Sequence, residues 1–312
     1  MLIKETGKVT NGFYIVGSST TPVYLLDGLE PVLFDGGFTA LARLYETGIK
    51  EILGDRSPAY LFLTHSHFDH VGAVSHFKDI WPELQIGGSA HCRKILKKTG
   101  AIKLIRELNI ETAKSLKKIG IKPLHEKPFE VFDIDMLIKP EQVIELSSNL
   151  TVKAINTPGH TWDFMSYWIP EKKILIASEA VGCYENNGYI QPEFLIDFDS
   201  YLESLRKIEK LGARILCGGH RAVFTDAEVK AHIDASFRAA DDFLTMVEGF
   251  LIQEKGDIDR TVSRVKVVQW DERSWPKQPE PAYMLNTQQR VKKIWERMNK
   301  NQDKRLKDIK IR

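Results

Sequence analysis

The stretch THSHFDH, residues 64–70, places three histidines and one aspartate within six consecutive positions. Side chains two residues apart on an extended chain point the same way, so His65 and His67 can share one metal ion. Asp69 and His70 can serve a second ion from the turn that follows. Imidazole and carboxylate groups suit zinc, iron or manganese, and burying them without a partner would be costly. The stretch therefore predicts a metal site.

Apolar runs separated by glycine and proline predict strands on both sides of this stretch. The runs are GFYIVG (12–17), PVYLLDG (22–28), PVLFDGG (31–37) and AYLFLTH (59–65), with further strand signals in 142–178 and in ARILCGG (213–219). Helical spacing of apolar residues predicts helices at 39–53 and 199–211. Alternation of strand and helix thus occurs twice, each time delivering a loop with chemically active side chains, and it indicates an α/β (α+β) fold.

Two helical segments are expected outside this pattern. Residues 90–127 resemble an insertion with apolar residues at three- to four-residue spacing. Residues 93–127 carry eleven Lys and Arg side chains against three Asp and Glu. This excess is either a solvated outer helix face or a source of attraction for an anionic substrate or partner. Residues 223–312 predict a C-terminal helical region.

Composition limits the class of protein. Hydrophobic residues make up 43% and charged residues 28%, values typical of a globular chain with a sizeable core. With 44 basic and 42 acidic residues the net charge is +2, which argues against a nucleic-acid partner held by bulk charge. No apolar run is long enough for a membrane span, and the first residues lack the apolar core of a signal peptide. Three scattered cysteines give no disulfide framework, so we expect a cytoplasmic protein.

At this point the sequence resembles the metallo-β-lactamase-fold superfamily, in its glyoxalase-II-like and lactonase-like branch. The matching elements are the loop His65-x-His67-x-Asp69-His70, NTPGHTWD (156–163) with His160, LIASEA (175–180) with Glu179, and LCGGHR (216–221) with His220. The resemblance spans roughly residues 10–221. It implies a four-layer αββα sandwich as a catalytic domain over residues 1–222. It also implies that the C-terminal helical region, residues 223–312, packs near the active-site cleft.

The resemblance also implies a ligand set for two divalent metal ions, with zinc favoured and iron or manganese as alternatives. Site one would be His65, His67 and His160, and site two would be Asp69, His70 and His220. Glu179 stands where the family usually has a bridging aspartate, and its extra methylene leaves open whether it bridges both ions or binds one. The LFDGG segment makes Asp35 a residue that orients a ligand histidine, or else an ordinary turn aspartate.

The implied activity is a metal-dependent hydrolase in which a metal-bound hydroxide cleaves a thioester, a lactone or a related carboxylic ester-type bond. Asp69 and Glu179 would be the catalytic carboxylates. The alternatives are a phosphodiester or phosphoester hydrolase, and a metal-loaded ligand-binding or regulatory protein with weak catalysis.

Further expectations concern the substrate and partners. Tyr184 is a candidate hydrogen-bond donor to a substrate oxygen, and Trp162, beside His160, either packs locally or lines the pocket. Cys217 is expected to be a small buried residue and not a ligand. We expect a small-molecule substrate, which the basic insertion would suit if it is anionic, and neither a nucleic acid nor a membrane as partner. A homodimer remains open.

Overall fold

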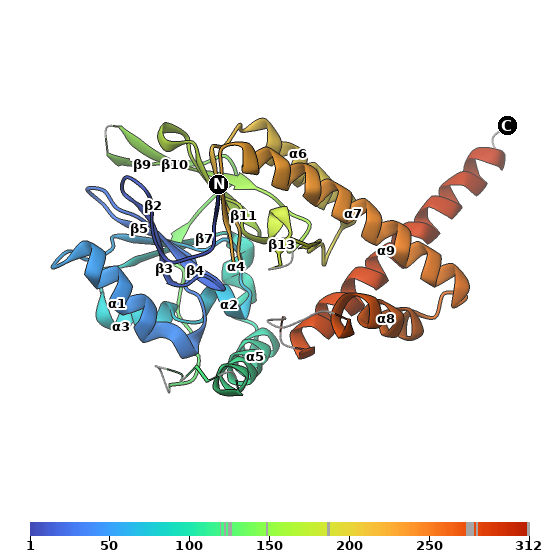
Figure 1. Ribbon diagram of the computed structural model, residues 1–312, viewed down its shortest axis with the longest axis horizontal. Helices are drawn as coiled ribbons and strands as arrows, with labels where there is room; N and C mark the ends of the chain where they lie inside the picture. The colour runs from blue at the N-terminus through green and yellow to red at the C-terminus, as the bar shows by residue number, and fades with distance from the viewer. Residues whose placement is uncertain are drawn as a thin grey trace.

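Two β-sheets packed face to face, with helices on both outer sides, form the body of the protein (Figure 1). The computed structural model describes residues 1–310 apart from 119, 122, 124–126, 148, 186–187, 273–277 and 279. Within the described residues each of the two large sheets has seven strands. This arrangement confirms the predicted four-layer αββα sandwich.

The first sheet comes from the N-terminal half of the chain. Its strands, in spatial order, are β2 (Gly7–Thr10), β3 (Phe13–Ser18), β4 (Thr21–Leu26), β5 (Val32–Phe34), β6 (Tyr60–Phe62), β7 (Gln85–Gly88) and β8 (Met136–Leu137). Its helices are α1 (Ala42–Leu53), α2 (Phe68–Val71), α3 (Val74–Ile80), α4 (Ala90–Ile95) and α5 (Thr99–Lys118). Helix α1 buries Tyr45, Ile49 and Leu53 at four-residue spacing, which is why this segment packs as an amphipathic helix.

The second sheet comes mostly from the C-terminal half. Its strands, in spatial order, are β1 (Leu2–Ile3), β16 (Val223–Thr225), β15 (Ile215–Cys217), β12 (Ile174–Ile176), β11 (Met165–Ile169), β10 (Leu150–Asn156) and β9 (Val143–Ser147). Helices α6 (Phe198–Lys210) and α7 (Ala227–Gln253) cover its outer face. Because β16 is part of this sheet, the sandwich runs to Thr225, three residues past the expected boundary at 222.

The interior between the sheets is apolar and aromatic. Phe62 lies 6.1 Å from Phe34 and 5.6 Å from Tyr167, measured between ring centroids, and these rings join the two sheets. Every residue of β4 is buried, since helices cover the outer face of the sheet and the second sheet covers the inner face.

Parallel pairing gathers the chemically active loops at one edge. Strands β5, β6 and β7 are parallel neighbours in the first sheet, as are β12 and β15 in the second. The carboxyl ends of parallel strands meet at the same edge of a sheet, where loops can converge on a ligand. Asp35 follows β5 and His65 follows β6, while Glu179 follows β12 and His220 follows β15.

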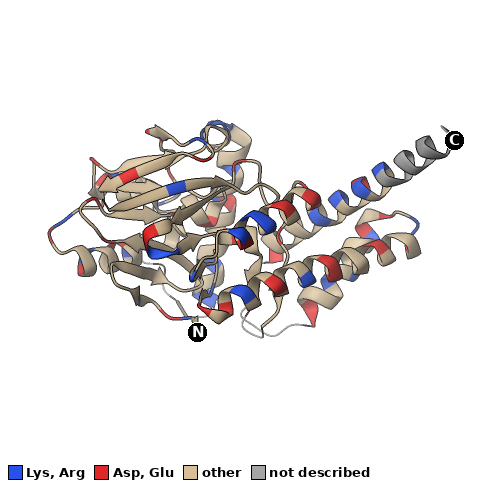
Figure 2. Ribbon diagram, turned by 90° about the horizontal axis from the view of Figure 1, so that it is seen from above, with Lys and Arg blue, Asp and Glu red and all other residues tan. Residues whose placement is uncertain are grey.

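The C-terminal helices extend from the second sheet (Figure 1). They are α7, α8 (Ile258–Lys266) with the π-helical turn Val267–Asp271, and α9 (Glu280–Lys310). Val291 and Ile294 of α9 belong to the same apolar cluster as α6 and α7. Basic and acidic side chains are interspersed along these helices (Figure 2). Among the described residues, no helix has the length and apolarity needed to span a bilayer.

The insertion contributes α4 and α5, as the apolar spacing predicted. Its last part, at 119, 122 and 124–126, lies outside the described residues, as does part of the loop before α9.

His232 on α7 gives a test of this packing. Its ring stacks on Phe224 at 3.8 Å, and its Nε2–H donates to the carbonyl of Val181 at 3.1 Å. Burial lowers the pKa of His232 to about 4, so the unfolded chain binds a proton first as the pH falls below about 6.5. The folded protein should therefore lose up to ~3 kcal/mol of stability through this group between pH 7 and pH 4.

Denaturant unfolding of the wild type and of His232→Gln over that pH range measures this contribution. The variant should be less stable at pH 7 and should show a smaller loss on acidification. Parallel pH profiles for the two proteins would contradict the assignment.

Candidate metal centre

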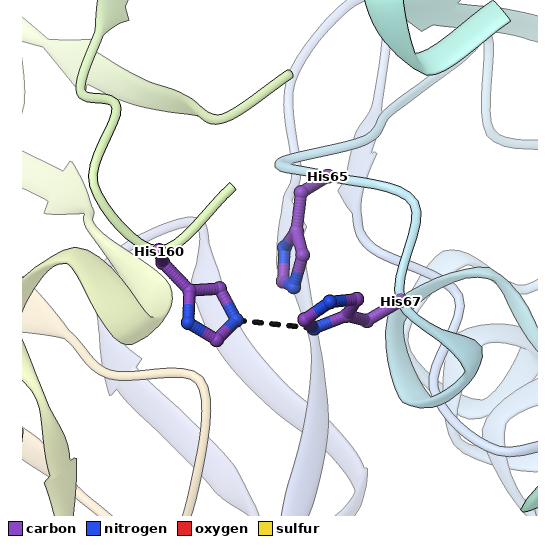
Figure 3. Close-up of side chains that lie close together, drawn as sticks. All are labelled: His65, His67 and His160. Carbon is purple, nitrogen blue, oxygen red and sulfur yellow. Dashed lines mark hydrogen bonds between the residues drawn. The ribbon is translucent and has the colours of Figure 1, made fainter. Parts of the chain in front are cut away.

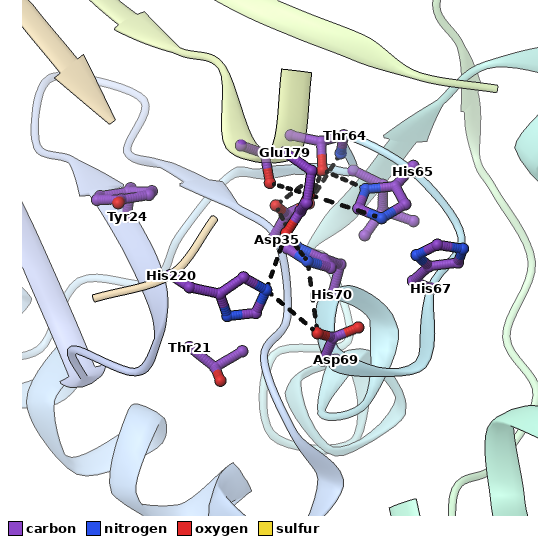
Figure 4. Close-up of polar contacts among 12 residues, drawn as sticks. Thr21, Tyr24, Asp35, Thr64, His65, His67, Asp69, His70, Glu179 and His220 are labelled. Atoms are coloured by element: carbon purple, nitrogen blue, oxygen red, sulfur yellow. Dashed lines mark hydrogen bonds and ion pairs between the residues drawn. The ribbon is translucent and has the colours of Figure 1, made fainter. Parts of the chain in front are cut away.

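Four loops bring the predicted ligands together at the edge described above (Figure 3 and Figure 4). His65 and His67 follow β6, and the short helix α2 supplies the next two ligands. His160 lies between β10 and β11, Glu179 in the turn after β12, and His220 between β15 and β16. The structure thus places all seven predicted ligand side chains in one cluster: His65, His67, Asp69, His70, His160, Glu179 and His220.

One group of three histidines forms one side of the cluster (Figure 3). His160 Nε2 lies 3.0 Å from His67 Nδ1, and the His65 ring lies 4.5 Å from the His67 ring. One ring nitrogen from each of the three histidines lies within 4.8 Å of the others. Three imidazoles at this separation can bind a single ion.

Glu179 lies between this group and a second one made of Asp69, His70 and His220. Its Oε1 is 3.0 Å from His70 Nε2 and 2.9 Å from His220 Nε2. Its Oε2 is 3.8 Å from His65 Nε2. The two carboxylate oxygens of Glu179 therefore face the two different histidine groups.

Hydrogen bonds on the outer side fix the orientation of the imidazoles. Thr64 donates its hydroxyl proton to Asp35 and accepts from His65 Nδ1 at 3.0 Å. Asp35 also accepts from His70 Nδ1 at 2.9 Å, which is the orienting contact expected of it. In both histidines the Nδ1 proton is held by an acceptor, so the Nε2 lone pair faces the cluster.

Two backbone carbonyls orient the remaining histidines in the same way. The carbonyl of Glu193 accepts from His160 Nδ1 at 2.6 Å, and the carbonyl of Thr20 accepts from His220 Nδ1 at 2.8 Å. Their Nε2 lone pairs therefore also point inward.

The electrostatics of the cluster favour positive charge at its centre. Burial opposes a charged His70, but Glu179, Asp35 and Asp69 outweigh it and hold the pKa of His70 well above its usual value. Burial raises the pKa of Glu179, but the neighbouring histidines, with His70 the strongest, together lower it by more. The pKa of Glu179 therefore lies well below its usual value, and the carboxylate is ionised. Burial lowers the pKa of His65, and it lowers that of His160 to about 3, so these imidazoles are neutral and can act as ligands.

The residues present fit divalent cations. His65 Nε2 is buried and makes no hydrogen bond among the described residues. The Nε2 atoms of His70 and His220 both lie next to Glu179 Oε1. Their lone pairs would be repelled by this oxygen unless a proton or a cation lay between them. Imidazole and carboxylate together are the donor set of zinc, iron and manganese sites.

A cavity of about 350 Å³ opens from the cluster. Its walls include five predicted ligands, and residues of α5 and α9 also line it. The five ligands are His67, Asp69, His160, Glu179 and His220. Tyr184 and Trp162 are not among its described lining residues. Tyr184 packs against Phe224, and Trp162 is 55% exposed, so their roles in substrate binding stay predictions. Cys217 is fully buried between the sheets, as expected.

Three residues of the site were not expected from the sequence. Asp163 accepts from the backbone N–H of Ser66 at 2.8 Å and so joins two ligand loops. Asp163 and Thr64 both stand inside the quoted motifs, and that position is the signal that could have found them. Glu193 is buried in the cavity wall beside His160, and no motif marks it.

The family model of the metallo-β-lactamase superfamily matches residues 17–220. The chain belongs to this superfamily. An atrochrysone carboxyl ACP thioesterase of Aspergillus fumigatus is 24% identical over 260 residues, 82% of this chain and 66% of that one. A hydroxyacylglutathione hydrolase of Bartonella henselae is 27% identical over 126 residues, 39% of this chain and 35% of that one. The chain spans two thirds or less of the length of these curated relatives.

Solved structures share the fold. The metallo-β-lactamase superfamily protein ST1585 from Sulfolobus tokodaii superposes with a TM-score of 0.57 at 18% identity, over 91% of this chain and 98% of that one.

Gly219 explains how a glutamate fits at position 179. A Cβ at Gly219 would overlap Oε1 of Glu179 and lie 2.7 Å from Ser178 Oγ. We expect Gly219→Ala to push the carboxylate away from His70 and His220 and to lower the bound metal per chain. Glu179→Asp withdraws the carboxylate by one methylene, so the double variant should retain more metal than Gly219→Ala alone.

Elemental analysis of the four proteins after zinc loading, with their melting temperatures, measures this coupling. If the losses of bound metal and of melting temperature in the double variant equal the sum of those in the single variants, Gly219 is required for a reason other than the length of the Glu179 side chain.

Proposed function

We propose that the protein is a metal-dependent hydrolase that cleaves a thioester or a related carboxylic ester-type bond, including a lactone. The observation that carries the proposal is the position of Glu179 between two histidine groups in the wall of a cavity. Membership of the superfamily, and relatives named as a thioesterase and a hydroxyacylglutathione hydrolase, support it.

His65, His67 and His160 would hold one ion, and Asp69, His70 and His220 the other. Glu179 would bridge them, with Oε2 toward the first group and Oε1 toward the second. Two divalent ions held by these residues would lower the pKa of a water molecule and polarise a carbonyl oxygen. Zinc is the ion that this histidine-rich donor set favours.

The chain's own residues supply positioning and proton transfer. Asp69 Oδ2 lies 3.4 Å from His220 Nε2 and lines the cavity, so it can accept and return a proton at the reacting centre. Burial raises the pKa of Cys183, the thiol in the cavity wall, which keeps it protonated and a poor nucleophile. A solvent molecule would supply the nucleophile.

A substrate panel tests the proposal. Zinc-reconstituted protein is assayed with chromogenic thioester, lactone, phosphodiester and β-lactam substrates. We expect turnover of a thioester or lactone. His67→Ala should lower kcat/KM by more than ~100-fold, because substitution of residues that only orient a metal ligand already lowers metal affinity or activity by about 10- to 100-fold. His91→Ala is the matched control, since His91 is exposed and lies outside the cluster.

Turnover of the phosphodiester alone would replace the proposal with the phosphoesterase alternative. Ligand binding without any turnover would favour a regulatory protein. Equal activity of His67→Ala and wild type would exclude the assigned centre.

A further inference from the structure

Two helices that lie outside the two sheets line part of the cavity. From α5 come Ala101, Leu104, Ile105 and Leu108, and from α9 come Ala282, Leu285, Asn286 and Gln289. Both sets have the spacing i, i+3, i+4 and i+7, so each helix presents one continuous stripe to the cavity. Figure 1 shows α5 and the first turns of α9 close together below the sheets. We call the space between these stripes the α5–α9 slot.

The two stripes differ in chemistry. The α5 stripe is entirely apolar, whereas the α9 stripe combines two apolar residues with two amides. Leu104 and Leu285, one on each helix, line the cavity and are 44% and 42% exposed, so each stripe presents an apolar side chain that is accessible to solvent. Among the described lining residues there is no Lys or Arg. The basic residues of the insertion therefore lie on other faces, and Lys103 pairs with Glu107.

Hydrogen bonds tie both helices to segments that carry ligands. Asn109 of α5 donates to the carbonyl of Phe68, the residue before Asp69, at 3.1 Å. Asn286 of α9 donates to the Glu193 carboxylate at 3.2 Å, and the carbonyl of Glu193 holds His160. The slot is therefore a fixed extension of the metal centre.

We propose that the α5–α9 slot binds an uncharged apolar acyl chain of the substrate, whose carbonyl group lies at the metal centre. The inference rests on the proposed function and adds the class of acyl group. The chain lies against the apolar stripe of α5, and Asn286 and Gln289 face the polar part of the substrate. Burial of each further methylene favours binding until the slot is filled.

Acyl thioesters with one leaving group and chains from acetyl to dodecanoyl test the slot. In the wild type, kcat/KM should rise by up to ~4-fold per added methylene and then level off. Ala101→Phe places a ring on the α5 stripe and should lower the ratio of decanoyl to acetyl kcat/KM at least tenfold. Leu108→Ala should move the preferred length to longer chains. Ile110→Phe, on an exposed position of α5 outside the lining, is the control and should keep the wild-type ratio.

Isothermal calorimetry with acyl amides measures binding to the slot independently of catalysis, because binding does not require cleavage of the amide. The dissociation constant should fall with chain length in the wild type and not in Ala101→Phe. A carboxylate added at the far end of the chain should weaken binding, because no basic side chain lines the described slot.

The outcomes are distinguishable. Thioester turnover that does not depend on chain length, or that depends on it equally in Ala101→Phe and Ile110→Phe, overturns the slot and leaves the proposed function standing. Length-dependent binding of amides without cleavage of any ester overturns the function and supports the slot.

Discussion

The buried carboxylate of Glu179 is the group on which the arrangement of the centre depends. Its two oxygens face imidazoles from opposite sides of the cluster, at 3.8 Å for His65 and at 2.9 Å and 3.0 Å for His220 and His70. An ionised group at this depth is costly unless positive charge balances it. The carboxylate and the converging nitrogens therefore create a place for cations, and the sandwich is what brings their strands to the same edge.

Hydrogen bonds from side chains behind the ligand histidines fix the orientation of their rings. Asp35 accepts from Thr64 and from His70, so one carboxylate after β5 sets the tautomers of two histidines, one of them through the Thr64 hydroxyl. It does so in a left-handed backbone conformation, with φ of 61°, which a tight turn into Gly36 and Gly37 requires. An ordinary turn aspartate would make no such pair of contacts, and this distinguishes the two interpretations that its sequence context left open.

The sequence predicted the ligands that lie close together in the chain, and those that stand in motifs whose order along the chain is typical of the family. THSHFDH carries four candidate ligands by itself. His160, Glu179 and His220 each follow a strand signal, so the order of the family's motifs along the chain was enough to assign them. Gly219 stands in a quoted motif, but its importance depends on the Glu179 side chain 40 residues earlier. The amphipathic spacing predicted α5 as a helix without showing that one of its stripes faces a cavity, because the opposite wall comes from α9, far along the chain.

The C-terminal helices belong to the site and not only to the core. Arg290 of α9 is fully buried, donates to the carbonyl of Pro192 at 2.9 Å and lies 4.7 Å from the centre of the Phe243 ring. Burying a guanidinium is expensive, so its position must be compensated by nearby acceptors and negative charge. Burial raises the pKa of the Glu193 carboxyl group, and the positive charge of Arg290 partly offsets that rise. Since the carbonyl of Glu193 also holds His160, a displacement of α9 would alter both the wall of the slot and the orientation of a ligand.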